Sequence, residues 1–140
     1  MREILFRGKT INNDSYANKA DGDWVYGYVY EGERYDSVGE PYSQMFIAEC
    51  DTDYTFEVDE DTIGEYTGIT NQWGEKLFEG DIVVIGNGKR KHLIEFDYGC
   101  FYYTKKLGLK KFYSNLYWGL RVIGNIHDDK EMLNETSNTI

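Results

Sequence analysis

The sequence predicts a mainly β protein built from antiparallel strands. Its 140 residues include 15 glycines and a single proline, a composition that suits many tight turns and argues against proline-rich linkers. Aromatic residues make up 16% of the chain and 13 of them are tyrosines, so we expect a packed core rather than disorder. The length fits one ordinary domain, and we expect residues 1–133 to form a single globular unit.

The first strands are expected within residues 3–38. The segment "EILFRG" predicts a strand that ends at Gly8, and the polar residues 12–23 predict a loop. In "WVYGYVYEGERYDSV" the tyrosines at 26, 28 and 30 alternate with valines, a period of two that predicts an antiparallel strand. We expect "EGE", residues 31–33, to turn the chain into its partner strand. Such a tyrosine row usually packs across strands, although it could also stack bases or sugars.

The middle of the chain predicts short strands separated by acidic or glycine-rich turns. "NQWG" is expected to be a turn, "EKLF" a strand, and "EGD" a second turn in which Gly80 takes a positive φ and Asp81 accepts backbone hydrogen bonds. The stretch "LFEGDIVVIGNGKRKHLIEF" lacks the spacing and the hydroxyl of a phosphate-binding loop. It predicts a hairpin instead, with strands at 82–85 and 91–97 joined by residues 86–88.

The last third predicts at least two more strands, the last in "LRVIGNI". Asp128 is suited to cap a helix because Glu131 follows three residues later, so a short C-terminal helix is expected at residues 129–134. Residues 134–140 have no apolar period and are expected to form a frayed polar tail.

Charge is unevenly distributed along the chain, whose net charge is −10. Residues 12–81 carry three basic and eighteen acidic residues, whereas residues 82–122 carry eight basic and two acidic ones. This polarity is compatible with head-to-tail self-association, with a local basic face, or with two solvated faces that bind nothing. A third binding hypothesis is that the acidic part mimics DNA and occupies a host DNA-binding protein.

The basic segment interleaves cations with aromatic residues, as single-strand nucleic-acid binders do. The alternative is that its lysines lie on the polar face of a hairpin while the aromatic rings point inward. The possible nucleic-acid contacts are Lys89, Arg90, Lys91, Tyr102, Tyr103, Lys105, Lys106, Lys110, Lys111 and Tyr113.

The sequence predicts no catalytic, cofactor or metal site, so we expect a non-enzymatic protein. The acidic run 51–62 resembles a calcium loop, but Phe56 and Thr62 stand where such a loop needs glycine and glutamate. Cys50 and Cys100 have no paired spacing and are expected to be buried free thiols, and neither His92 nor His127 has a metal-ligand spacing. The start "MREILFRGKT" lacks the apolar stretch of a signal peptide and no membrane span is evident, so a cytoplasmic location is expected.

Four motifs in register resemble the YopX family of phage and prophage proteins: "MREILFRG", "WVYGYVY", "TIGEYTGITNQWGEKLFEGDIVVI" and "RVIGNIHDDKEML". The resemblance covers most of the chain and implies a cytoplasmic, phage- or prophage-encoded accessory protein that forms a homo-oligomer. It also implies a small barrel, and we expect a barrel-like (SH3-like) unit over residues 62–127 with residues 1–61 as a sheet-forming part packed against it. The family brings no known reaction, ligand or catalytic set, so no functional residue is carried over. The expected role is then a protein-interaction module, with an unknown host or phage protein as partner.

Overall fold

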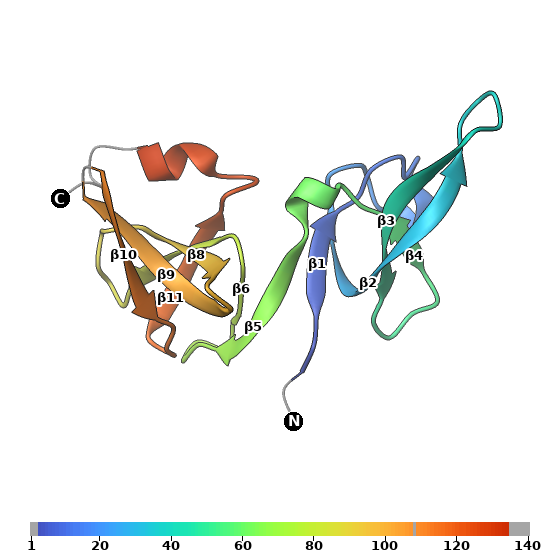
Figure 1. Cartoon of the computed structure of the whole chain (residues 1–140). Helices are drawn as coiled ribbons and strands as arrows, with labels where there is room; N and C mark the ends of the chain where they lie inside the picture. Colours follow the sequence, from blue (N-terminus) through green and yellow to red (C-terminus); the bar gives the residue numbers. More distant parts are fainter. Residues whose placement is uncertain (1–2, 108, 135–140) are drawn as a thin grey trace. The chain divides into compact units, whose positions relative to one another are not determined.

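The computed structural model of the chain describes residues 3–107 and 109–134. The chain forms two compact units, Met1–Glu65 and Tyr66–Ile140. Figure 1 shows that both consist of antiparallel strands joined by turns and short 3-10 helices, which confirms the prediction of a mainly β fold. The boundary between the units falls inside strand β5 (Gly64–Thr70).

The first unit is a sheet with the strand order β4-β3-β2-β1. Strand β1 also pairs with the first two residues of β5. The long hairpin of β2 and β3 continues past its neighbours as a two-stranded ribbon (Figure 1). The elements are β1 (Phe6–Lys9), η1 (Tyr16–Asn18), β2 (Trp24–Tyr35), β3 (Pro41–Glu49), β4 (Thr55–Glu57) and η2 (Glu60–Thr62).

The core of the first unit lies against one face of this sheet. It is formed by the fully buried side chains of Val25, Ile47, Phe56 and Val58. Along β2, side chains alternate between the core face and the opposite face, as the two-residue period predicts. Gly27 lies where β3 approaches most closely, because a Cβ atom there would stand 1.9 Å from the carbonyl oxygen of Ala48. Only glycine therefore fits this crossing without a backbone shift.

The predicted turn at residues 31–33 is wrong, because β2 continues to Tyr35 and pairs with Pro41. The chain reverses at residues 36–40 instead. There the Asp36 carboxylate accepts hydrogen bonds from the backbone N–H groups of Val38 and Glu40, both at 2.9 Å, and Gly39 takes a φ of 86°. These local bonds make the later turn the better one, and such side-chain bonds favour Asp in turns.

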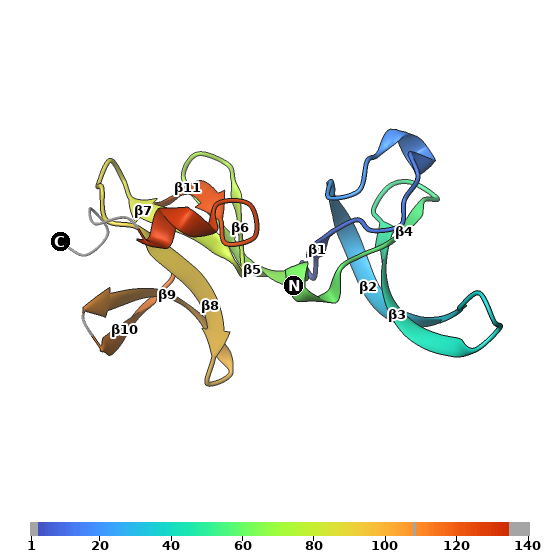
Figure 2. The same ribbon diagram turned by 90° about the horizontal axis from the view of Figure 1, so that it is seen from above.

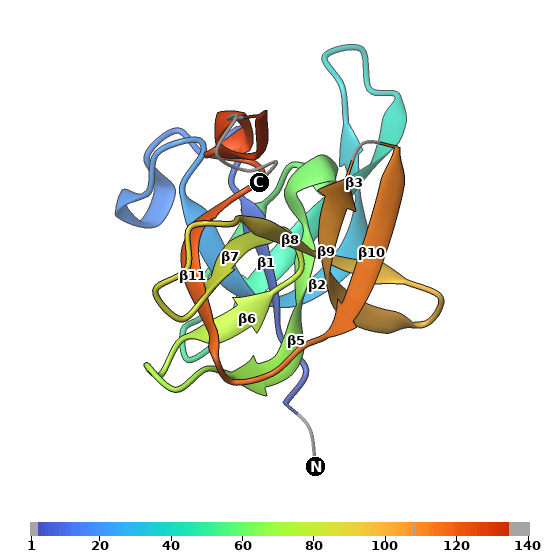
Figure 3. The same ribbon diagram turned by 90° about the vertical axis from the view of Figure 1, so that its left-hand side faces the viewer.

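The second unit contains a five-stranded sheet with the order β10-β9-β8-β7-β11. The part of β5 that begins at Tyr66 pairs with β6. Strands β7 to β10 form a meander, and β11 returns to pair with β7, as Figure 3 shows. The elements are β6 (Lys76–Phe78), β7 (Asp81–Ile85), β8 (His92–Asp97), β9 (Cys100–Leu107), β10 (Lys110–Asn115), β11 (Leu120–Asn125) and η3 (Lys130–Asn134).

Two finer predictions for this unit are corrected. The sheet is open rather than a closed barrel, because within the described residues no strand ladder joins the edge strands β10 and β11 (Figure 2). The expected C-terminal α-helix is only the 3-10 helix η3. The Asp128 carboxylate accepts a hydrogen bond from the Asn125 side chain at 3.1 Å. The predicted frayed tail lies, after Asn134, outside the described residues.

The predicted hairpin at residues 82–97 is confirmed, with β7 paired to β8. The turn before it also forms as expected: Gly80 has a φ of 93°, and the buried Asp81 carboxylate accepts the backbone N–H of Phe78 at 2.8 Å. The Gly80 N–H donates a hydrogen bond to the Ile94 carbonyl oxygen at 2.9 Å, and the Gly80 carbonyl oxygen accepts one from the Ile126 N–H at 2.8 Å. The turn therefore connects β6, β8 and the segment after β11.

His92 is a polar side chain packed beside the core of the second unit, which is formed by Leu77, Val83, Ile94 and Leu120. It is 4% exposed, and its ring meets that of Tyr103 edge to face with centroids 5.1 Å apart. Among the described residues, its Nδ1 atom has no hydrogen-bond partner. Burial lowers the pKa of His92 below its usual 6.5. The nearby charges of Arg90 and Lys105 lower the pKa further, against the opposing effect of a hydrogen bond with the Thr104 backbone.

We predict that Gly80→Val lowers the free energy of unfolding by more than about 1 kcal/mol, because a β-branched residue is strained at positive φ. Thermal or urea unfolding measures the effect. Ile85→Val, at the exposed end of β7, is a control and should unfold close to the parent. A Gly80→Val protein as stable as the parent would contradict the turn conformation.

We predict that the stability of the protein decreases as the pH falls below the usual pKa of histidine. Because the pKa of His92 is lowered on folding, the unfolded chain takes up the proton first, and acid favours unfolding. The midpoint of thermal unfolding should therefore drop less for His92→Phe than for the parent between about pH 7 and pH 5. His127→Phe, which changes an exposed ring, should follow the parent. Identical profiles for all three proteins would show that His92 does not titrate differently on folding.

Candidate functional site

The predicted basic residues gather at one end of the five-stranded sheet. Strand β7 ends at Ile85 and β8 begins at His92, while β9 ends at Leu107 and β10 begins at Lys110. Because these neighbours are antiparallel, all four points lie at the same end of the sheet. This basic end consists of Lys89, Arg90, Lys91, Lys105, Lys106, Lys110 and Lys111.

The basic end does not present its cations on one face. Lys106 pairs with Lys111 across β9 and β10, so these two share a face. Lys105 pairs with Phe112 and points to the other face, where its Nζ atom lies 5.9 Å from the centre of the Phe112 ring. A ligand lying on either face would therefore meet only part of the positive charge.

A carboxylate occupies the face that carries Lys106 and Lys111. The Lys111 ammonium lies 2.7 Å from Glu95 Oε2, and the Thr104 hydroxyl donates to the same oxygen, also at 2.7 Å. The hydrogen bond with Glu95 raises the pKa of Lys111. Lys111 is therefore already paired within the sheet, which weakens this face as a phosphate site.

One predicted aromatic platform, Tyr113, lies beside the basic end, where the Lys111 Nζ atom is 5.6 Å from the centre of its ring. Tyr102 and Tyr113 meet edge to face with ring centroids 5.5 Å apart, and Tyr98 adds a third ring 5.9 Å from Tyr113. The Tyr113 hydroxyl donates to Asp97 at 3.3 Å. Tyr103 packs against the core instead. The three rings thus form a cluster that contacts both Lys111 and the acidic Asp97.

A larger aromatic surface lies on the first unit, on the sheet face opposite its core. Tyr26, Tyr28 and Tyr30 are 41%, 59% and 47% exposed, as expected from their alternation with the buried Val25. Tyr42 of β3 lies on the same face, since it pairs with Arg34, and is 43% exposed. We call these four side chains the tyrosine face. The prediction that the tyrosine row packs across strands is confirmed for Tyr30, which stacks on Phe46 of the neighbouring strand.

Three cationic side chains and one carboxylate of the protein itself lie beside the tyrosine face. The Arg7 guanidinium lies 4.7 Å and the Lys9 ammonium 5.7 Å from the centre of the Trp24 ring. Arg34 Nε lies 2.5 Å from Oε1 of the buried Glu57. All of these side chains share the face, because Arg7 and Lys9 pair with Tyr26 and Trp24.

Aromatic packing holds one tyrosine of this face in place. Tyr30 stacks on Phe46 with centroids 5.3 Å apart and a 13° angle between the rings. Gly32 leaves room for this stack, since a Cβ atom there would lie 2.7 Å from the Phe46 ring. Sequence reasoning missed Tyr42, Phe46 and the Arg34–Glu57 pair. The alternation in "PYSQMFIAE" was the available signal, but only the strand register places these residues beside β2.

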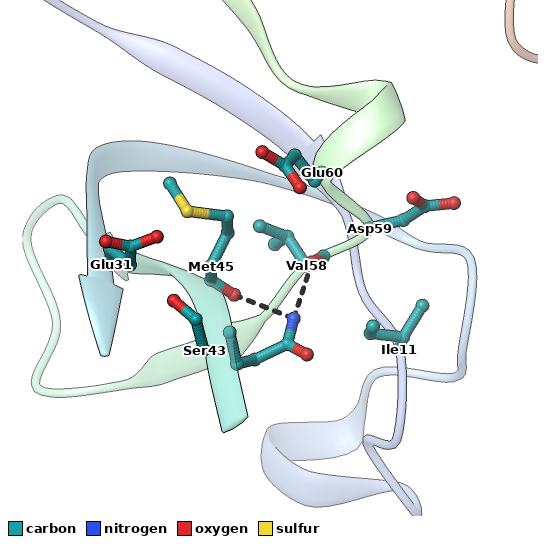
Figure 4. Close-up of a pocket in the computed structure, with 8 residues that line it drawn as sticks. Ile11, Glu31, Ser43, Met45, Val58, Asp59 and Glu60 are labelled. Carbon is teal, nitrogen blue, oxygen red and sulfur yellow. Dashed lines mark hydrogen bonds between the residues drawn. The ribbon is translucent and has the colours of Figure 1, made fainter. Parts of the chain in front are cut away.

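A shallow hollow of about 270 Å³ opens on the first unit (Figure 4). The Gln44 side chain closes part of it by donating to the carbonyl oxygens of Met45 and Val58, at 3.2 and 3.0 Å. The hollow is lined by Ile11, Glu31, Ser43, Gln44, Met45, Val58, Asp59 and Glu60. The acidic lining suits a cation better than an anion, but no group in the hollow is arranged as a nucleophile or a general base.

Other candidate chemistry does not converge in the described residues. No group of three or more His, Cys, Asp or Glu side chains there could hold a metal ion. Cys50 and Cys100 are free, as expected, but Cys50 is half-buried and Cys100 is exposed, so the expectation that both are buried is wrong. Burial and the neighbouring Asp51 raise the pKa of the Cys50 thiol, so it is a weaker nucleophile than an ordinary thiol. None of the helices in the described part of the chain is long and apolar enough to cross a membrane.

Comparison with known proteins identifies the family. Among curated proteins, none matches this chain. Among solved structures, the crystal structure of protein EF1440 from Enterococcus faecalis is similar. It has 24% sequence identity, covers 95% of this chain and 99% of that chain, and gives a TM-score of 0.48. A family model described as YopX protein matches residues 17–134, which confirms the resemblance seen in the sequence motifs. The chain belongs to the YopX family.

Proposed function

We propose that this chain is a non-enzymatic accessory protein of phage or prophage origin that acts in the bacterial cytoplasm by binding proteins, including copies of itself. The phage origin follows from what YopX membership implies. The binding role is supported by exposed, chemically distinct surfaces: the tyrosine face on the first unit and the basic end on the second. Exposed tyrosines of this kind are enriched at protein interfaces.

The observation that carries the self-association proposal is the separation of charge between the units. Residues 1–65 contain five basic and sixteen acidic residues, a net charge of −11. Residues 66–140 contain ten basic and nine acidic residues, and seven of the ten lie at the basic end. The first unit of one copy is thus complementary to the basic end of another, an arrangement that favours head-to-tail association.

We predict that the protein is an oligomer at low salt and dissociates as salt is added, because exposed charges are screened beyond about 10 Å at 0.1 M ionic strength. Light scattering over a salt series measures the mass. The double variant Lys106→Glu/Lys110→Glu should be monomeric, whereas Lys76→Glu/Lys130→Glu, with the same charge change elsewhere in the second unit, should associate like the parent. A parent that is monomeric at about 50 μM in low salt would refute head-to-tail association, since standard interfaces are occupied at such concentrations.

A second candidate function is binding of single-stranded nucleic acid at the basic end. The observation that favours it is the convergence of seven cations at one end of a sheet. Glu95 weighs against it, because this carboxylate already pairs with Lys111 on the face that carries the Tyr113 ring. For this reason we rank it below protein binding.

If this second function holds, a labelled single-stranded oligonucleotide should bind at low salt. The logarithm of its affinity should fall linearly with the logarithm of the salt concentration, with a slope of about −0.7 per neutralised phosphate. Fluorescence anisotropy measures the binding. Lys105→Glu/Lys106→Glu should abolish it, because these residues supply cations to both faces. Absence of any signal at about 100 μM protein would exclude the function, because even non-specific dissociation constants reach only about this value at physiological salt and are lower at low salt.

A further inference from the structure

The hollow on the first unit combines an apolar floor with an acidic rim. Its floor includes Val58, which is fully buried, and Met45, which packs against the core. Figure 4 shows the Met45 side chain between the carboxylates of Glu31 and Glu60, and both of these residues are exposed. Within the described part of the chain, neither carboxylate forms an ion pair. Their charge is therefore available to a cationic partner.

The turn between β9 and β10 of the second unit presents the complementary chemistry. Leu109, immediately before β10, is fully exposed. Lys106 of β9 and Lys110 of β10 are exposed as well, and they lie on either side of this turn because the two strands pair up to it. We call Lys106, Leu109 and Lys110 the leucine tip. It offers one apolar side chain flanked by two positive charges.

The hollow and the leucine tip match each other in polarity and in size. An apolar centre surrounded by charged groups is the usual arrangement of a protein interface, and the two surfaces supply both parts of it with opposite charges. A hollow of about 270 Å³ has room for a leucine side chain. When an exposed apolar side chain fits a hollow elsewhere on the same molecule, copies associate head to tail.

We propose that the leucine tip of one copy docks in the hollow of another copy. Leu109 covers the apolar floor, and the two lysines of the tip lie beside the carboxylates of the rim. This inference rests on the proposed self-association and identifies the two surfaces that meet. The occupant is a second copy rather than a small free cation, because such a cation leaves the apolar floor in water whereas the leucine removes it from water.

Light scattering of the full chain at about 50 mM salt, where screening is weak, tests the apolar contact without changing any charge. Leu109→Ser should weaken association at least about tenfold, because it removes the leucine that is buried on docking. Val38→Ser makes a similar change at the exposed tip of the β2–β3 hairpin and should associate like the parent. Ser43→Phe fills the hollow from an exposed position and should also weaken association, whereas Ser37→Phe, at an exposed position outside the hollow, should not.

Charge reversal tests the ionic contacts at the rim. Glu31→Lys/Glu60→Lys should be monomeric, because the rim then repels the lysines of the tip. Glu40→Lys/Asp53→Lys makes the same charge change at exposed positions elsewhere in the first unit and should remain oligomeric. Equal loss of association in both double variants would overturn the docking site, because it would reduce the effect to the net charge of the unit.

Mixing two monomeric variants gives the decisive result. Glu31→Lys/Glu60→Lys mixed with Lys106→Glu/Lys110→Glu should associate, because opposite charges then meet at both kinds of contact, and no association on mixing would refute the docking site. A parent that oligomerises at low salt and is unaffected by Leu109→Ser would also refute it, while leaving head-to-tail association intact. A parent that is monomeric under the same conditions would refute both, so the two failures are distinguishable.

Discussion

The first unit depends on one constraint, the two-residue alternation of side chains along β2. In the first part of this strand alternate residues enter the core with Val25, so the residues between them must lie on the other face. The close crossing at Gly27 fixes β3 against β2 and thereby aligns Tyr42 and Phe46 with the tyrosines. Burial of one face thus creates the exposed aromatic surface on the other. The tyrosine face is therefore a consequence of burying the opposite face of β2.

In the second unit, the turn at Gly80 and Asp81 is the constraint that fixes how the strands are arranged. The Gly80 backbone bonds both β8 and the segment after β11, while the Asp81 carboxylate bonds the end of β6. Three separate parts of the chain meet at two residues, which explains why an acidic side chain is tolerated in a buried position. Its oxygen replaces a backbone acceptor that the turn cannot supply. The orientation of β7, and with it the position of the basic end, follows from this junction.

The sequence was sufficient wherever the deciding interactions are local. The positive φ of Gly80, the hydrogen bond of Asp81 and the alternation of β2 all depend on a few neighbouring residues, and these predictions are confirmed. Interactions that depend on register were beyond reach. The opposite orientation of Lys105 and Lys106, and the pairing of Lys111 with Glu95, require knowing how β8, β9 and β10 align. The "EGE" turn failed for the same reason, since Gly32 serves a ring on the neighbouring strand rather than a reversal of the chain.

The ribbon formed by the ends of β2 and β3 limits how this hairpin can change in length. Its turn is closed by local bonds of Asp36 and does not depend on the core, so extra residues there cost little. Yet adding one residue to each strand would exchange the faces of every side chain between the insertion and the turn. Two residues per strand would restore them. Length variation in this hairpin is therefore expected in even steps, with odd steps inverting the chemistry that the tip presents to solvent.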